Sequence, residues 1–270
     1  MATEYFNDAW RIPNNKNQSL VSNYSMEFDG TNDFVNLGSS AYLNDLQQAS
    51  FSSWIKFDSV DGGPGNCFLS DMNTSTLGHF GMVVRQPAGR IRLSFYLKRS
   101  LNSQVIIDVD PDFFTTEINT WYHVVMVFDG TLSGPSADDL NRAKIYINGQ
   151  LEVSSSAVTA AIEYDGYDPT IGGIANLWGY WYNGLMDEVR IWDDVRTAAE
   201  ISTYYNRSVA SDASNLVAYY KADESPGTST MADETANANA TATIASTTTA
   251  PATATAATTK SATSVKNSFS

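Results

Sequence analysis

From residue 24 onward, apolar and polar residues alternate in short runs that are separated by turns rich in glycine, asparagine and aspartate. Alternation with a period of two indicates strands with one buried face, and no long stretch shows the 3.6-residue period of a helix. Regularly spaced short runs of this kind predict an all-β protein, built as a two-sheet antiparallel sandwich. The predicted strands cover residues 25–28, 33–37, 51–57, 91–97, 105–109, 121–128, 144–147, 151–153 and 185–192.

Two turns are predicted to close hairpins between neighbouring strands. Asn148-Gly149 is the strongest short hairpin signal, because both residues tolerate left-handed backbone. The turn at residues 29–32 is predicted to close a second hairpin, between strands 25–28 and 33–37, with one buried face. The most apolar run, 121–128, is predicted to be a central strand covered on both faces. The side chains expected to be buried are Trp54, Trp121, Phe128 and Ile191.

One short helix is predicted over residues 194–205. Thr197 is followed three residues later by Glu200, which is the pattern of a capping box at a helix start. Ile201 and Tyr204 or Tyr205 would give this helix one apolar side.

Composition divides the chain into three regions: an N-terminal arm at 1–23, a globular domain at 24–225 and a low-complexity tail at 226–270. The tail contains 13 Thr and 12 Ala, and Phe269 is its only aromatic residue. So few large apolar groups cannot offset the entropy of ordering a separate core. We therefore expect the tail to be irregular or extended, to contact other chains and to add little to the stability of the domain. Residues 215–224 are predicted to add one strand to the sandwich.

Charge and cysteine content narrow the functional classes. The formal net charge is −14, which disfavours binding to nucleic acid or to anionic lipid. The single cysteine, Cys67, rules out a disulfide within the chain and a thiolate metal cluster. No run approaches the ~20 apolar residues that a membrane span needs.

Seven pieces of the sequence, in this order, resemble the laminin-G-like branch of the concanavalin A-like lectin/glucanase superfamily. They are MEFDGTNDFV at 26–35, FSSWIKF at 51–57, TWYHVV at 120–125, FDG at 128–130, IYING at 145–149, TIGG at 170–173 and NGLMDEVRIW at 183–192. Together with the helix that follows, they cover about residues 24–206. The resemblance implies a jelly roll of two antiparallel sheets, in agreement with the strand pattern. It does not fix the function, because this fold hosts glycan binders, glucanases and structural modules.

The chain also resembles, by analogy, modules that tailed bacteriophages carry on the virion surface. The first thirty residues show no export signal, and the chain is acidic, poor in cysteine and ends in Ala/Thr repeats. The leading hypothesis is therefore a non-catalytic virion structural protein, a surface decoration or appendage subunit synthesised in the host cytoplasm. It would contact other virion proteins or copies of itself through residues 1–23 and 226–270. The alternatives are an adhesin for host-surface glycans and a glycan-degrading enzyme.

Enzymatic activity is not expected. Glucanases of the superfamily carry a Glu-x-Asp-x-x-Glu motif, which places two carboxylates on one strand face for acid/base and nucleophilic roles. The nearest stretch here is Asp187-Glu188, and it has no partner carboxylate at the required spacing. His79 and His123 lie in unrelated strands.

One structural Ca²⁺ is a possible cofactor, because hard cations bind clustered oxygen ligands. In sandwiches that this chain resembles, such an ion can lie between the first and last strands. The ligand candidates implied are Asp29, Asn32, Asp33 and Asp187. The run Asp108–Asp112 is a second candidate, although alternating aspartates are more often a solvated strand face.

Residues 177–182 place four aromatic rings close together, beside a glycine. Sugars stack their C–H faces on exposed aromatic rings, so this segment is a candidate glycan site. The same rings would serve a protein interface, or would cover the edge of the sandwich with Tyr180 and Tyr182 pointing inward. The candidate residues are Trp178, Tyr180, Trp181 and Tyr182.

Overall fold

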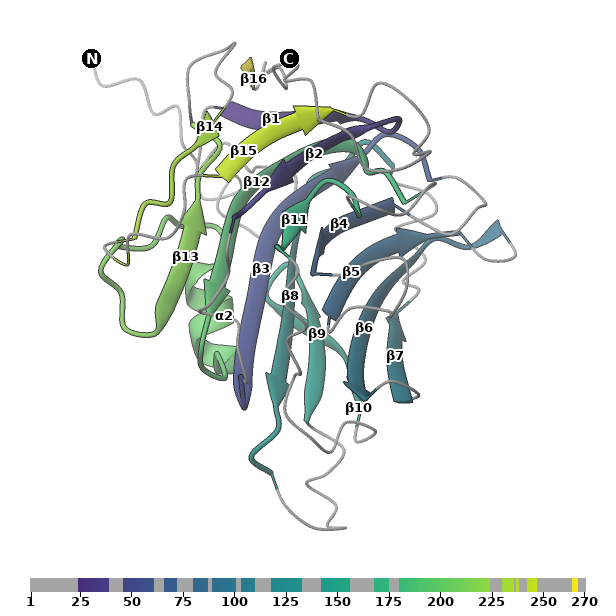
Figure 1. Ribbon diagram of the computed structural model, residues 1–270. Helices are drawn as coiled ribbons and strands as arrows, with labels where there is room; N and C mark the ends of the chain where they lie inside the picture. Colours follow the sequence, from purple (N-terminus) through teal and green to yellow (C-terminus); the bar gives the residue numbers. More distant parts are fainter. Residues whose placement is uncertain are drawn as a thin grey trace, which may run out of the picture.

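The computed structural model shows two antiparallel β-sheets packed face to face, with one short helix against the outside of one sheet (Figure 1). The all-β sandwich predicted from the strand pattern is confirmed. The residues described are 24–38, 46–60, 66–71, 80–86, 89–100, 103–109, 118–132, 142–155, 168–174, 180–223, 230–235, 237, 242–246 and 264–266. The predicted arm at 1–23 lies outside these residues.

Sheet A contains the apolar strand that was predicted to be central. In the described residues its order is β10 (Gln150–Ser155), β9 (Ala143–Ile147), β8 (Tyr122–Asp129), β3 (Gln48–Phe57), β12 (Asn183–Trp192), β1 (Tyr24–Asp29) and β16 (Ser264–Lys266). β1 pairs with the first half of β12, and β13 (Leu216–Tyr220) pairs with the second half. The prediction that residues 215–224 add a strand is therefore confirmed.

Sheet B faces sheet A across the core. Its order in the described residues is β14 (Thr230–Met231), β15 (Ala242–Ser246), β2 (Asp33–Asn36), β11 (Thr170–Ile171), β4 (Asn66–Ser70), β5 (Phe80–Arg85), β6 (Arg92–Ser100) and β7 (Ser103–Val109). Sequence analysis did not identify β4 and β5, which begin beside the Gly-rich and polar segments 61–65 and 72–79.

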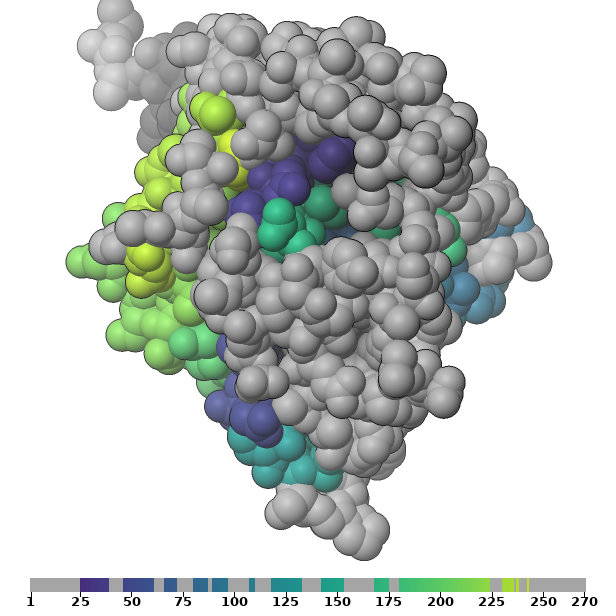
Figure 2. All heavy atoms as spheres, in the orientation of Figure 1, coloured from purple at the N-terminus to yellow at the C-terminus, as the bar shows by residue number. Residues whose placement is uncertain are grey.

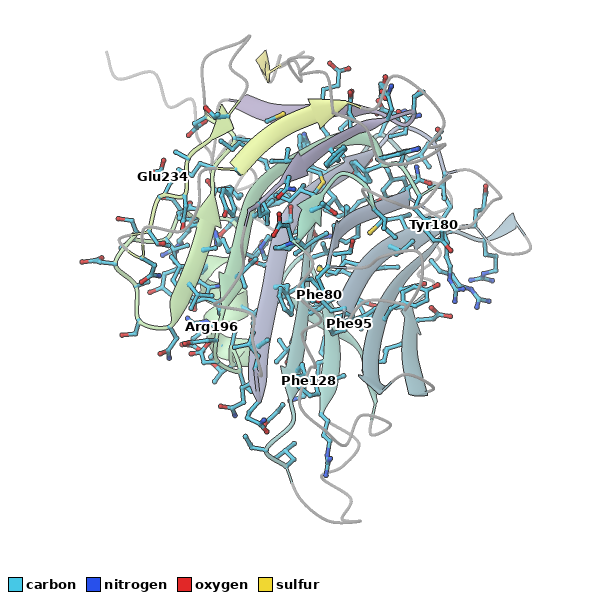
Figure 3. The ribbon with its side chains drawn as sticks, viewed as in Figure 1. Phe80, Phe95, Phe128, Tyr180, Arg196 and Glu234 are labelled. Atoms are coloured by element: carbon cyan, nitrogen blue, oxygen red, sulfur yellow. The ribbon has the colours of Figure 1, made fainter. Side chains whose placement is uncertain are left out.

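The core lies between the sheets, where alternate residues of each strand point inward. Phe51 of β3 stacks on Phe80 of β5, with ring centroids 4.4 Å apart, and meets Phe95 of β6 edge-on (Figure 3). Trp54, Phe128 and Ile191 are buried as predicted. Trp121 was expected to join them but is partly exposed, because it precedes the first residue of β8.

The central strand and the second turn also follow the prediction. β8 lies between β3 and β9 and is buried on both faces. Asn148 and Gly149 connect β9 to β10 with φ angles of 54° and 80°, the left-handed pair that a tight hairpin turn requires.

The turn at residues 29–32 does not close a hairpin, which corrects the prediction. β1 pairs with β12 and β16 in sheet A, whereas β2 pairs with β11 and β15 in sheet B. The turn is instead a corner at which the chain passes from one sheet to the other. Alternation in β1 and β2 reflects burial against the opposite sheet, and it carries no information on which strand is the hydrogen-bonded neighbour.

Helix α2 (Ala198–Tyr204) covers the outer face of sheet A, over β8 and β9 (Figure 1). The predicted capping box is present: the Glu200 amide donates to Thr197 Oγ1 and the Thr197 amide donates to Glu200 Oε2. Ile201 packs on Val125, Val127 and Tyr146. α2 has seven residues, and in the described part of the chain no helix is long and apolar enough to cross a membrane.

The described parts of the C-terminal segment, β14, β15 and β16, pair within the sandwich, which corrects the expectation that they lie outside it. β15 pairs with β2, β16 pairs with β1, and Met231 and Ala242 are buried in the main core. Residues from β13 onward also form part of the surface at the left of Figure 2. The strands are extended, as expected for Thr-rich backbone, but the sheet edges they occupy belong to this chain. Strands of the sandwich therefore continue beyond residue 225, where the domain boundary is predicted.

Candidate functional site

The outer face of sheet B, over β5, β6 and β7, gathers aromatic and charged side chains. Leu93 and Phe95 of β6 point into the core. Strand alternation therefore places Arg92, Ser94 and Tyr96 on the opposite, outward face. β5 and β7 add charged residues in register, because Arg85 pairs with Arg92 and Asp108 pairs with Ser94. We call this group, together with Tyr180, the β6 face: Arg85, Arg92, Ser94, Tyr96, Asp108 and Tyr180.

A polar network links the three strands of the β6 face. Arg85 Nη2 lies 2.5 Å from Asp108 Oδ2, and Arg85 Nε donates to Ser94 Oγ at 2.7 Å. Arg92 Nη1 lies 3.6 Å from the same Asp108 oxygen. The side chains of Arg85, Arg92 and Asp108 are 23%, 34% and 28% exposed. The network is therefore ordered by its own contacts and still accessible to a ligand.

Two tyrosines lie beside this network. Tyr96 and Tyr180 are half-buried and pack on a small apolar cluster of Cys67, Val83 and Ile174. The Arg85 guanidinium lies 5.8 Å from the centroid of the Tyr96 ring. Burial raises the pKa of Tyr96, against the opposing effect of Arg85. Its phenol is therefore neutral at ordinary pH, and it both donates and accepts hydrogen bonds.

Backbone contacts of Gly172 and of residues 180–182 fix where Tyr180 lies. The Cys67 amide donates to the Tyr180 carbonyl at 3.0 Å, and the Tyr182 amide donates to the Gly172 carbonyl at 2.8 Å. Gly172 has a φ of +84°, and a Cβ there would lie 2.0 Å from Phe28 Cε1. The chain can therefore make this close turn only with glycine. Tyr180 is thereby held at the side of the molecule opposite Arg196 (Figure 3).

The four aromatic candidates have different environments. Tyr182 is fully buried, with its ring against Phe28 and Phe68, so it belongs to the core and is not available to a sugar or a partner. Trp181 is partly exposed and lies 6.1 Å from Phe34, ring centroid to ring centroid. Tyr180 joins the β6 face. Trp178 lies outside the described residues.

The Ca²⁺ ligand candidates do not converge. Asp29 pairs with Asn183 at the start of β12, and Asp187 lies four residues further along that strand, about 13 Å away. Asp29 Oδ1 accepts hydrogen bonds from the Thr31 and Asn32 amides, which makes it a turn-forming residue. Asp187 is fully buried, and its Oδ1 accepts from the Glu188 amide.

The remaining Ca²⁺ candidates fit no better. Asp33 begins β2 in sheet B. Asp108 of the second candidate run is engaged by two arginines on the β6 face. In the described residues, no group of three or more His, Cys, Asp or Glu side chains is arranged to hold a metal. Asp110 and Asp112 of the second run lie outside the described residues, and a Ca²⁺ ion held by this chain stays a prediction.

A second polar cluster lies at the outer face of sheet A, under α2, and is buried. Glu188 accepts hydrogen bonds from Arg190 and from the Tyr219 hydroxyl. Arg190 also donates to the Tyr204 and Arg207 carbonyls, at 3.3 and 2.7 Å. Glu188 and Arg190 are 1% and 2% exposed, so this carboxylate is closed to a substrate.

A small cavity next to this cluster is too small for a sugar. It has a volume of about 30 Å³ and is lined by residues that include Ser52, His123, Arg190 and Tyr205. Binding pockets for small molecules begin at about 300 Å³, whereas a space of this size holds one or two waters. The β6 face is therefore the better candidate for ligand binding.

Comparison with known families identifies the fold. The sequence profile described as the concanavalin A-like lectin/glucanases superfamily, Laminin_G_3, matches residues 29–202, more than half of the chain. The chain belongs to this superfamily. No curated protein matches the sequence. The resemblance seen in the seven sequence pieces is thereby confirmed.

Solved structures share the superfamily fold at low sequence identity. A candidate carbohydrate-binding protein from Bacteroides ovatus is 18% identical with a TM-score of 0.57, and the match covers 82% of this chain and 58% of that one. The chain thus spans less than two thirds of that protein. The heptameric SAP-like pentraxin of Limulus polyphemus is also 18% identical with a TM-score of 0.50, over 68% of this chain and 82% of that one.

Sequence analysis found one residue of the β6 face as a glycan candidate, Tyr180, and missed the others. The strand 91–97 was predicted, and its alternation already separates Arg92, Ser94 and Tyr96 from the core residues. The outward-facing positions of this strand could therefore have identified Arg92, Ser94 and Tyr96 as candidate site residues. Arg85 could not have been identified in the same way, because its strand, β5, was not predicted.

Proposed function

We propose that this superfamily member is a non-catalytic carbohydrate-binding module, and that it binds glycan through the β6 face. The observation that carries the proposal is the juxtaposition of Tyr96 and Tyr180 with the accessible Arg85–Asp108–Arg92 network. The shared fold with the candidate carbohydrate-binding protein of Bacteroides ovatus supports it. The glycan-binding alternative of the sequence analysis is therefore placed before the purely structural one.

The chemistry of the β6 face matches what sugar recognition needs. Tyrosine rings offer apolar surface to the C–H face of a pyranose, and their hydroxyl groups offer hydrogen bonds at the rim. Guanidinium groups donate to ring and hydroxyl oxygens, and a carboxylate accepts from hydroxyl groups. Because Arg85 and Asp108 already hold one another, a ligand would meet these groups in fixed positions, which lowers the entropy cost of binding.

The state of Glu188 argues against catalysis. The sequence stretch nearest to the glucanase motif is Asp187-Glu188, and both side chains are buried. Glu188 is engaged by Arg190 and Tyr219, and Asp187 by the Glu188 amide. Neither carboxylate is open to a glycosidic bond, which the paired carboxylates of a glycosidase must flank.

The test is a binding screen with variants of the two tyrosines. The full chain is immobilised and exposed to an array of plant, bacterial and animal glycans. Tyr96→Ala and Tyr180→Ala should each weaken binding about tenfold or more, as expected for the loss of a stacking ring. Tyr204→Ala is the matched control, because Tyr204 is 42% exposed on α2, at the other sheet. Absence of binding to every glycan, or full binding by both variants, would overturn the proposal.

We further propose a virion surface as the setting of this module, with residues outside the sandwich connecting it to other virion proteins. The Ala/Thr repeats between β15 and β16, the acidic charge and the single cysteine support this setting by analogy. Mass spectrometry of purified particles, with antibody labelling by electron microscopy, tests it. Exclusive recovery of the protein from cell envelopes would contradict it.

A further inference from the structure

One row of residues runs across the strands of sheet B and through the β6 face. Val83 of β5 pairs with Cys67 of β4 on one side and with Ser94 of β6 on the other. Ser94 in turn pairs with Asp108 of β7. The residues that flank this row along β5, β6 and β7 lie in or against the main core, so strand alternation directs the row outward. The β6 face is therefore one part of a longer line of outward positions.

The same row continues from β4 onto β11 and β2. The Gly172 amide donates to the Phe68 carbonyl at 3.1 Å, so the next residue, Gly173, reaches the level of Cys67. Phe34 of β2 lies at this level as well, and the residue that follows it is in the main core, so alternation directs Phe34 outward. Parts of β2 and β11 are visible at the surface near the middle of Figure 2. We call the whole line the outer row: Phe34, Gly173, Cys67, Val83, Ser94 and Asp108.

The Trp181 ring lies on the outer row at Gly173. A Cβ on Gly173 would lie 2.4 Å from Trp181 Cε3 and 2.7 Å from Cζ3, so the indole rests directly on the backbone there. Such a close approach of ring and backbone leaves room only for glycine. Phe34 lies beside the indole, with ring centroids 6.1 Å apart. Trp181 is nevertheless partly exposed. The ring is thereby held in one place on the outer face of sheet B and is still accessible.

Three aromatic side chains therefore follow one another across the strands of sheet B. Trp181 lies over the end of β11, Tyr180 packs on Cys67 of β4 and Val83 of β5, and Tyr96 belongs to β6. Three strand steps separate β11 from β6, and at about 4.8 Å for each step they amount to roughly 14 Å. A pyranose ring is comparable in size to one strand step. A single sugar therefore cannot contact Trp181 and Tyr96 together, whereas a chain of several sugars can.

We propose that the glycan bound by the β6 face is an extended chain that lies across the strands of sheet B, with Trp181 contacting sugars beyond those on Tyr96 and Tyr180. This inference rests on the proposed function and specifies its ligand class, an oligosaccharide or polysaccharide chain rather than a single terminal sugar. Each ring offers apolar surface to the C–H face of one sugar. Because the sheet holds the rings in place before the ligand binds, each further sugar adds to the affinity at little entropy cost.

The experiment measures the affinity of the full chain as a function of glycan length, by isothermal titration calorimetry. Disaccharides, tetrasaccharides and hexasaccharides are compared within the cellulose, xylan, chitin and polygalacturonate series. Length-separated fragments of any other array glycan that binds are tested in the same way. In at least one series, the hexasaccharide should bind about tenfold more tightly than the disaccharide, which is the gain expected for one further stacking ring.

Two variants test whether the gain with length arises at Trp181. Trp181→Ala removes the ring, whereas Gly173→Ala keeps the ring in the chain and fills the space that it occupies. Both should remove most of the gain with length and leave the affinity for the disaccharide unchanged, because Tyr96 and Tyr180 remain. Tyr204→Ala is the matched control, since it removes an exposed ring at the other sheet, and it should keep the whole gain. A melting curve for each variant checks folding, and Gly173→Ala decides if Trp181→Ala does not fold.

The outcomes separate this inference from the proposed function. Equal affinity for disaccharide and hexasaccharide, with binding still lost in Tyr96→Ala, would overturn the inference and leave the proposed function intact. A gain with length that persists in both Trp181→Ala and Gly173→Ala would also overturn it, because the further sugars would then contact another surface. Equal weakening of disaccharide and hexasaccharide by Trp181→Ala would overturn it as well. Failure to bind any glycan would overturn both.

Discussion

The two sheets each carry an arginine, a carboxylate and a tyrosine on their outer faces, in similar arrangements. On sheet A, Arg190 pairs with Glu188 and lies 5.3 Å from the centroid of the Tyr219 ring. On sheet B, Arg85 pairs with Asp108 and lies 5.8 Å from that of Tyr96. The first cluster is closed under α2, whereas the second is accessible.

Burial decides whether such a cluster of arginine, carboxylate and tyrosine stabilises the fold or can contact a ligand. Under α2, Arg190 directs its donors to Glu188 and to the carbonyls of Tyr204 and Arg207, so the cluster joins β12 to the residues at the end of the helix. Tyr219 adds β13 to the same network. On the β6 face, the guanidinium groups of Arg85 and Arg92 contact Asp108 and remain partly open to solvent. The buried cluster organises the fold, and the accessible one is available for recognition.

The largest expected effect comes from Glu188→Gln, which removes the negative charge from the buried cluster. Arg190 would remain charged and nearly inaccessible, without its counter-charge. Breaking a buried ion pair in this way costs about 3–5 kcal/mol of unfolding free energy. Denaturant titration of the variant and the parent protein measures the difference. A loss below about 1 kcal/mol would show that the buried cluster does not organise the fold as argued.

The sequence predicts what is set by neighbouring residues and misses what is set by distant ones. The Asn148-Gly149 hairpin and the Thr197–Glu200 capping box were predicted correctly, because each depends on a few adjacent residues. The corner at residues 29–32 was read as a hairpin, because pairing of β1 with β12 rather than β2 is a long-range choice. The local sequence does not reveal this pairing, since β1 needs the same alternation of apolar and polar residues whether its neighbour is β2 or β12.

The same limit applies to the C-terminal strands and to the site. An Ala/Thr segment has no core of its own, but β15 pairs with the edge of β2 and buries Ala242. The exposed edge of β2 is a partner that composition does not reveal. In the site, Tyr180 was a candidate because of its aromatic neighbours in the sequence, whereas its proximity to Tyr96 depends on the backbone contact between Tyr180 and Cys67 of β4.

A smaller effect is expected from pH, through His123 at the buried cluster. His123 is 3% exposed, its two ring nitrogens make no hydrogen bond within the described residues, and its ring lies near Trp54 and Tyr205. Burial, together with the Arg190 charge, holds its pKa well below the ordinary value of 6.5. The unfolded chain therefore takes up a proton at a higher pH than the folded one does. Stability from neutral His123 is complete above pH ~6.5 and is lost as the pH falls below it.

The measurement compares unfolding free energies of the parent protein and of His123→Phe between pH 7.5 and 5. The difference between the two proteins should change by up to about 1.4 kcal/mol per pH unit below pH ~6.5, because one group contributes at most one proton. Groups common to both proteins cancel in this difference. A pH-independent difference would mean that His123 is protonated alike in the folded and unfolded chains.

The smallest expected effect comes from Asp108→Asn, the same chemical change as Glu188→Gln at the accessible cluster. Asp108 and the two arginines that it contacts are between 23% and 34% exposed, so water and salt already screen their charges. Accessible ion pairs contribute about 0–1 kcal/mol, and the unfolding free energy should fall by no more than that. Both variants remove one negative charge and one carboxylate oxygen. If they are measured under the same conditions, the difference between their losses of unfolding free energy therefore reports the effect of burial. Comparable losses for the two variants would show that the β6 face contributes as much to the stability of the fold as the cluster under α2 does. The reason for assigning ligand recognition to the first and stabilisation of the fold to the second would then be removed.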